Sequence, residues 1–211
     1  MNNVVFNKDC MIGMAETPDK YYDLAVVDPE FGIGIARSPR LVTDKGLIAK
    51  AWDDKPIDEN YFTELFRVSK NQIIWGGNYY NLGVTKHCVI WDKKQPEKLS
   101  FGMFDFAWTS FDGANKAFRY HVHKEADKIH PTQKPVELYG WIFRNYAKPG
   151  MKILDTHVGS GSSRIAAHTY GLDYTGYEID AEIYAAQELR FANYCRKATL
   201  FTPTLPPAIA M

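Results

Sequence analysis

One segment near the carboxyl end constrains the fold more than any other part of this 211-residue chain. Residues 152–180 read KILDTHVGSGSSRIAAHTYGLDYTGYEID. An apolar strand ends in Asp155, a turn carries Gly159 and Gly161, a helical stretch follows, and a second strand ends in Glu178. This order predicts a parallel α/β sheet with a ligand site at the carboxyl edge of its strands.

The chemistry of the turn indicates the ligand. Glycines let a ligand approach the backbone closely, and an acid that ends the next strand can accept hydrogen bonds from both ribose hydroxyls. The turn is not GxGxxG, and it carries Asp155 where a pyrophosphate would lie. A carboxylate favours a cationic, phosphate-free nucleoside such as S-adenosylmethionine. Packing alone is the alternative explanation of the glycines, and a nicotinamide oxidoreductase is the more distant functional alternative.

Apolar runs that alternate with stretches of helical spacing predict one α/β domain over residues 1–211. Strands are expected at residues 4–6, 23–28, 72–76, 87–92, 105–111, 151–155 and 173–178. Helices are expected at residues 57–69, 135–147, 162–170 and 181–196. The connection between the fourth and fifth strands holds no helical pattern, which predicts an antiparallel pair there.

The charge balance excludes binding to nucleic acid through overall charge. Lys and Arg number 25, as do Asp and Glu, so any such contact must come from local clusters. No apolar run reaches the roughly 20 residues of a membrane span, and we expect a cytoplasmic protein without a membrane partner. Neither the three cysteines nor His121, His123 and His130 have the spacing of a metal site, so no metal is predicted.

Two further motifs carry polar chemistry. The Asp28 carboxylate and the Pro29 carbonyl follow an apolar strand, and both can accept hydrogen bonds from one exocyclic amine while Phe31 stacks on the attached ring. Taken alone, Asp-Pro after a strand is more often a plain turn. Residues 130–135, HPTQKP, supply hydroxyl, amide and ammonium groups just before a helix, and alone they indicate only a polar loop.

In this order, the three motifs resemble the β group of circularly permuted DNA amino-methyltransferases, many of them encoded by phages and restriction systems. The resemblance covers nearly the whole chain. It implies a Rossmann-like S-adenosylmethionine-dependent methyltransferase fold, with a seven-stranded, mostly parallel sheet and one antiparallel edge pair. It also implies DNA as a partner, a homodimer in some members, and the host cytoplasm as the location of a phage-encoded protein.

The resemblance also implies site residues. The catalytic residues would be Asp28, Pro29 and Phe31. The cofactor-binding residues would be Asp9, Cys10, Thr132, Lys134, Asp155, His157, Gly159, Ser160, Gly161, Ser162 and Glu178. Members usually read Asp-Pro-Pro-Tyr in the catalytic motif, whereas this chain has Glu30 and Phe31, and His157 stands where phenylalanine is common. Glu30 leaves open a catalytically impaired homologue that binds cofactor and DNA.

The implied reaction is direct in-line methyl transfer to the exocyclic nitrogen of a base that has been flipped out of the duplex. Methylation of cytosine C5 would need a cysteine nucleophile, usually after proline, and none of the three cysteines follows a proline. Asp28 favours adenine N6 as the target, because the cytosine-N4 enzymes more often have serine at that position. Cytosine N4 is the alternative.

DNA contacts must come from local basic stretches, for which a solvated surface is the alternative explanation. Basic residues outnumber acidic ones between residues 114 and 152, and a second basic stretch follows the catalytic motif. The predicted DNA-binding residues are Arg37, Arg40, Lys93, Lys116, Arg119 and Lys124. Residues 92–130 are predicted to form a small DNA-recognition region.

Overall fold

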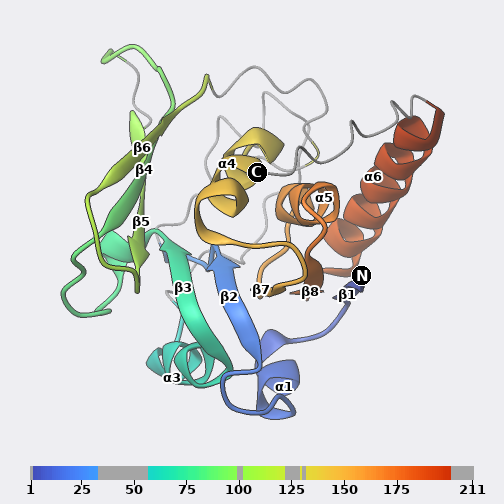
Figure 1. Cartoon of the computed structure of the whole chain (residues 1–211), viewed down its shortest axis with the longest axis horizontal. Helices are drawn as coiled ribbons and strands as arrows, with labels where there is room; N and C mark the ends of the chain where they lie inside the picture. The colour runs from blue at the N-terminus through green and yellow to red at the C-terminus, as the bar shows by residue number, and fades with distance from the viewer. Residues whose placement is uncertain (1, 33–56, 99–101, 122–128, 130–131, 201–211) are drawn as a thin grey trace, which may run out of the picture.

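The computed structural model describes residues 2–32, 57–98, 102–121, 129 and 132–200. They form one eight-stranded sheet in the order β1-β8-β7-β2-β3-β5-β4-β6, with helices on both of its faces (Figure 1). The strands are β1 (Asn3–Phe6), β2 (Tyr22–Val27), β3 (Ser69–Trp75), β4 (Cys88–Asp92), β5 (Phe104–Thr109), β6 (Lys116–Arg119), β7 (Lys152–Asp155) and β8 (Asp173–Tyr177). The helices are α1 (Cys10–Ala15), α3 (Glu59–Val68), the short 3-10 helix η2 (Gly77–Tyr79), α4 (Val136–Tyr146), α5 (Ser162–Thr169) and α6 (Ala181–Leu200).

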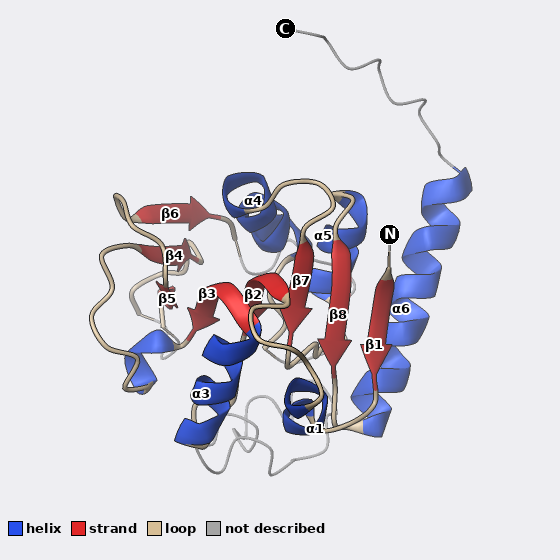
Figure 2. Ribbon diagram, turned by 60° about the horizontal axis from the view of Figure 1, so that its bottom comes forward, coloured by secondary structure: helices blue, strands red, loops and turns tan. Residues whose placement is uncertain are grey.

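Strand β2 lies at the centre of the parallel part of the sheet and is apolar on both faces. Leu24 and Val26 belong to a core that includes residues of α4 and α5, whereas Ala25 and Val27 belong to a second core with residues of α1 and α3. Figure 2 shows α1 and α3 on one side of the sheet and α4 and α5 on the other. A central parallel strand is covered on both faces, which explains why its sequence is continuously apolar.

The sheet has one strand more than predicted. Strand β6, Lys116–Arg119, was not expected because its sequence, KAFR, is short and polar, and three of its four residues are exposed. The predicted antiparallel pairing of β4 with β5 is confirmed. The pair does not form the edge, however, because β5 is also antiparallel to β3, and β6 pairs in parallel with β4 on the outside. Both β5 and β6 fall within residues 92–130.

The order of the strands brings distant parts of the chain together. Strands β1, β8, β7, β2 and β3 are neighbours and all run parallel, so the segments that follow them leave at the same edge of the sheet. The segment after β2 therefore lies between the segments after β7 and β3. Among the described residues, no helix is both long and apolar enough to cross a membrane.

Candidate active site

Asp28 directly follows β2 and pairs with a buried lysine. The Lys134 ammonium donates a hydrogen bond to Asp28 Oδ2, and the same ammonium lies 5.3 Å from the centre of the Trp75 ring. The other carboxylate oxygen, Asp28 Oδ1, is buried and accepts no hydrogen bond from any described residue. Buried acceptors are almost always paired in folded proteins, so this oxygen is a candidate acceptor for a ligand.

Burial raises the pKa of Asp28 above its ordinary value, although the charge and hydrogen bond of Lys134 oppose the shift. The nearby Asp105 carboxylate adds to the increase. A carboxylate with a raised pKa is a stronger base than an exposed one. Lys134 therefore contacts the predicted catalytic acid, whereas the family resemblance assigned it to the cofactor.

Aromatic residues after β3 hold the segment that contains Phe31. Tyr80 Oη donates to the carbonyl oxygens of Pro29 and Glu30, at 3.0 Å in each case. The Phe31 ring stacks on Tyr79, with 5.1 Å between ring centres and 18° between planes. Its other neighbour is Gly76, where a Cβ atom would lie only 2.2 Å from the ring. Tyr79 and Tyr80 were interpreted as core residues, yet Tyr79 is 49% exposed.

The turn after β7 needs its glycines. Gly159 and Gly161 have positive φ angles of 52° and 75°, which favour glycine. Asp155 stabilises the turn from the inside: Oδ1 accepts from the His157 amide at 3.0 Å, and Oδ2 accepts from the Ser163 hydroxyl at 2.5 Å. Tyr174 Oη also donates to Oδ2, at 3.2 Å. Both oxygens of Asp155 thus have donors within the protein, and its side chain is buried.

Glu178 holds the same turn from the next strand. Its Oε2 accepts from the Gly159 amide and its Oε1 from the Asp180 amide, at 2.9 Å in each case. Burial raises the pKa of Glu178, although these amides oppose the shift. Arg190 of α6 was not predicted as a site residue. It donates to the Ser160 carbonyl at 2.8 Å and to the Ser162 hydroxyl at 2.9 Å, which fixes the start of α5.

A direct ion pair joins the catalytic segment to the glycine turn. His157 Nε2 lies 3.2 Å from Glu30 Oε2, and both side chains are mostly buried. Burial alone would raise the pKa of Glu30, but the His157 charge and hydrogen bond lower it below its ordinary value. Burial opposes a charged imidazole as well, yet the Glu30 carboxylate raises the pKa of His157 above 6.5. The two motifs therefore meet at one edge of the sheet.

Asp9 and Cys10 begin α1 beneath this edge. Asp9 Oδ1 accepts from the Met11 amide at 2.8 Å and caps the helix. Burial raises the pKa of the Cys10 thiol to about 12, and the charges of Asp9 and Glu30 add to the shift. A thiol with this pKa is protonated at neutral pH and is a poor nucleophile.

The predicted DNA-binding residues do not all lie together. Lys93 pairs with Asp105 at 2.7 Å, and Arg119 lies 3.5 Å from Asp92; both follow or end strands at the edge that carries Asp28. Lys116 begins β6 at the opposite edge and donates to Asn145 at 2.9 Å. The remaining predicted residues, Arg37, Arg40 and Lys124, lie outside the described residues. Thr132 is exposed.

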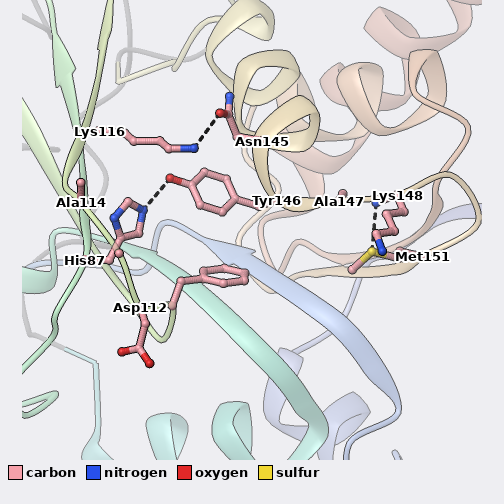
Figure 3. Close-up of a pocket in the computed structure, with 11 residues that line it drawn as sticks. His87, Asp112, Ala114, Lys116, Asn145, Tyr146, Ala147, Lys148 and Met151 are labelled. Carbon is pink, nitrogen blue, oxygen red and sulfur yellow. Dashed lines mark hydrogen bonds between the residues drawn. The ribbon is translucent and has the colours of Figure 1, made fainter.

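A separate pocket of about 540 Å³ lies at the opposite edge of the sheet, where β4 and β6 begin and α4 ends. Figure 3 shows His87 and Lys116 reaching toward Tyr146 and Asn145 of α4. His87 Nε2 lies 2.7 Å from the Tyr146 hydroxyl. None of the predicted catalytic or cofactor-binding residues lines this pocket. No group of three or more His, Cys, Asp or Glu suited to a metal ion occurs in the described part of the chain.

The parallel sheet, with β5 inserted antiparallel and a glycine turn after β7, is a Rossmann-like fold of the methyltransferase class. Solved structures that share it include M1.HpyAVI in complex with S-adenosylmethionine, with a TM-score of 0.60, 17% identity, and coverage of 88% of this chain and 98% of that one. They also include the cytosine-N4-specific PvuII DNA methyltransferase, with a TM-score of 0.64, 12% identity, and coverage of 100% and 89%.

Sequence comparison identifies the family. Residues 72–188 match the model of the N6/N4 methyltransferases, described as DNA methylase, and the chain belongs to this family. YubD of Escherichia coli K12, named as a putative methylase, is 24% identical over 205 residues, which cover 87% of this chain and 88% of YubD. TTHA0409 of Thermus thermophilus, named as a DNA modification methylase and solved with S-adenosyl-L-methionine, has a TM-score of 0.55 at 15% identity, covering 92% and 94%.

Proposed function

We propose that the protein transfers a methyl group from S-adenosylmethionine to the exocyclic N6 of adenine in DNA. The observation that carries the proposal is Asp28 Oδ1, a buried acceptor that no described residue satisfies, at the same edge of the sheet as the glycine turn. Family membership supports DNA as the substrate. An amine that reaches this oxygen also approaches whatever ligand the turn holds.

The residues of the turn fit S-adenosylmethionine, which supplies a methyl carbon bonded to a positively charged sulfur. The left-handed Gly159 leaves its surface open, because an added Cβ atom would have its nearest neighbour 4.0 Å away. Glu178 ends the adjacent strand, where a carboxylate can accept hydrogen bonds from ribose hydroxyls. Two of the similar solved structures, M1.HpyAVI and TTHA0409, contain this cofactor.

The chain's own residues orient the amine. Asp28 Oδ1 accepts one of its N–H groups, and the Pro29 carbonyl, which retains a second lone pair beside the Tyr80 hydrogen bond, accepts the other. The nitrogen forms a bond to the methyl carbon as the carbon–sulfur bond breaks, and Asp28, whose pKa burial raises, is the base positioned to receive the proton it releases. Phe31 and Tyr79 offer a stacking surface for the flipped base.

Glu30 is compatible with activity. A free carboxylate there would repel DNA phosphates, but His157 pairs with it at 3.2 Å and offsets its charge. This pairing argues against the impaired homologue. Adenine is preferred over cytosine because of the aspartate at position 28, as in the sequence argument. A cytoplasmic location, where DNA is accessible, follows from the same proposal.

A labelled-methyl assay tests the function. The protein is incubated with mixed-sequence DNA and labelled S-adenosylmethionine, the DNA is digested to nucleosides, and the products are identified by mass spectrometry. We expect N6-methyladenosine as its deoxynucleoside. Label in N4-methylcytosine would replace the adenine assignment by the cytosine alternative, and unlabelled DNA together with tight S-adenosylhomocysteine binding would support the impaired homologue.

A further inference from the structure

The two positions at which this chain departs from the family pattern contact each other. Glu30 stands at the second proline of the usual catalytic motif, and His157 stands where phenylalanine is common. Their side chains form the ion pair between Nε2 and Oε2 at 3.2 Å. A proline fixes its own φ and restricts the residue before it, so its replacement removes rigidity from the segment that carries the two amine acceptors.

The imidazole of His157 is fixed on its other side as well. Its Nδ1 lies 2.9 Å from Thr156 Oγ1, which in turn lies 2.5 Å from the Tyr61 hydroxyl of α3. The Tyr61 ring meets the imidazole edge-on, with 5.5 Å between ring centres. Both ring nitrogens therefore have oxygen partners, and a protonated imidazole can donate to both. Glu30 is thus connected to α3 through three side chains.

The surroundings of His157 are mainly acidic. Glu30 faces it from the segment after β2, Asp155 from the end of β7, and Glu178 from the end of β8. Asp28 is close enough to feel its charge but is itself paired with Lys134, and the other titratable groups nearby are Tyr61 on α3 and, beside Glu30, Cys10 on α1. Three facing carboxylates favour the imidazolium form.

We propose that Glu30 and His157 act as a positioning ion pair that holds the Asp28–Phe31 segment against the glycine turn, so that methyl transfer depends on the positive charge of His157. The proposal rests on the proposed function and deepens it. Neither residue touches the reacting atoms. The pair takes over the rigidity that a second proline would give, and it makes that rigidity sensitive to pH.

The sign of the pH effect follows from the two partners. The pair exists only while Glu30 is ionised and His157 is protonated. Because Glu30 lowers the acidity of the imidazolium, the charged pair persists above the ordinary His pKa of 6.5 and is lost when the pH rises through the raised value. We therefore expect kcat to fall on the alkaline side as His157 loses its proton.

A double-mutant cycle tests the coupling. Glu30→Gln and His157→Phe each remove the pair, and we expect each to lower kcat about tenfold, the effect of roughly one half-buried ion pair on positioning. Glu30→Gln/His157→Phe should be no slower than the slower single variant. Glu30→Pro/His157→Phe, which installs the usual family residues, should recover kcat and lose the alkaline decline. Lys70→Gln removes the Lys70–Asp23 pair at the opposite edge and serves as the matched control with unchanged kcat.

Two readouts separate positioning from cofactor binding or misfolding. The dissociation constant of S-adenosylhomocysteine, measured by calorimetry, should stay within about twofold in Glu30→Gln, because Glu30 lies on the catalytic segment rather than on the turn. NMR titration of the His157 imidazole should give a pKa that falls in Glu30→Gln. This second readout does not require activity, so it still tests the pair if the wild-type protein transfers no methyl group.

Three results would overturn the inference. Losses that multiply in Glu30→Gln/His157→Phe would mean that the two residues act independently. An unchanged His157 titration in Glu30→Gln would mean that the pair does not form. An alkaline decline that survives in His157→Phe would assign the pH dependence to another group. Each of these leaves the proposed function standing if the wild-type protein methylates DNA.

Discussion

The pairing of Lys134 with Asp28 gives a prediction in which stability and catalysis change together. Lys134 is 6% exposed and the Asp28 side chain is 22% exposed, so Lys134→Met leaves a mostly buried carboxylate without its cation. Breaking a fully buried pair from one side costs about 3–5 kcal/mol, and the partial exposure of Asp28 reduces this to about 2–4 kcal/mol. For a chain of this size, that corresponds to a decrease in Tm of about 5–12 °C.

The same substitution should shift the pH profile. Burial raises the pKa of Asp28, and Lys134 is the largest opposing influence. Without Lys134 the pKa rises further, so Asp28 takes up its proton at a higher pH. We expect the acid limb of kcat/KM in the methyl-transfer assay to move to higher pH, and urea unfolding to report the loss of stability.

Two variants serve as controls. Lys134→Met/Asp28→Asn removes both charges and should regain most of the lost stability, because no buried charge is left alone. Lys93 occupies a similar arrangement, paired with Asp105 and 5.4 Å from the centre of the Trp91 ring, so Lys93→Met tests a comparable lysine away from Asp28. A loss below about 1 kcal/mol in Lys134→Met, or an acid limb that stays in place, would refute the reasoning.

Three further predictions concern the turn, the ion pair and the thiol. Gly161→Ala and Gly83→Ala both force alanine to a φ of 75°, but only the Gly161 Cβ meets a neighbour, Gln187 Oε1 at 3.2 Å; urea unfolding should show a loss of about 1 kcal/mol for Gly83→Ala and a larger one for Gly161→Ala, and equal losses would exclude crowding. The stability difference between wild type and Glu30→Gln, about 1 kcal/mol, should be full between pH 4.5 and 6.5, where both partners are charged in either state, and should shrink as the pH rises through the raised pKa of His157; a difference that grows above neutral pH would contradict the assigned charges. Because its thiol pKa is about 12, Cys10 should react with iodoacetamide at pH 8 far more slowly than the partly exposed Cys195, and peptide mapping that finds equal rates would show that Cys10 is accessible as a thiolate.

The parallel strands could be predicted because burial on both faces leaves a clear pattern. Leu24 to Val27 are apolar without interruption, as a central parallel strand requires. Strand β6 could not be predicted in this way, since its sequence is mostly polar and it is held by pairing with β4 rather than by burial. An edge strand of this kind carries little sequence signal.

The site was predictable as a set of motifs but not as a network. Side chains after strands that neighbour each other in space must meet at one edge, which is why the segment of Asp28 and the turn of Gly159 could be connected in advance. The contacts between them depend on side-chain direction and on tertiary distance. Nothing in the spacing of Glu30 and His157, or of Ser160 and Arg190, indicates that these pairs touch.

Asp155 shows a second limit of motif reasoning. The sequence argument turned this carboxylate toward a cationic ligand, whereas its oxygens accept from the His157 amide, Ser163 and Tyr174 inside the protein. An acid at a turn can hold the backbone as well as a ligand, and only coordinates separate the two. We therefore expect Asp155→Asn to affect stability as well as cofactor affinity.

The division of labour at the rim is tested most directly by Asp28→Asn, because it keeps the shape of the side chain and removes its charge. Calorimetry should give an S-adenosylhomocysteine dissociation constant close to that of the wild-type protein, while transfer of labelled methyl to DNA falls about 100-fold or more. Transfer at the wild-type rate, or loss of cofactor affinity to the same extent as loss of transfer, would contradict the assignment of Asp28 to the target amine.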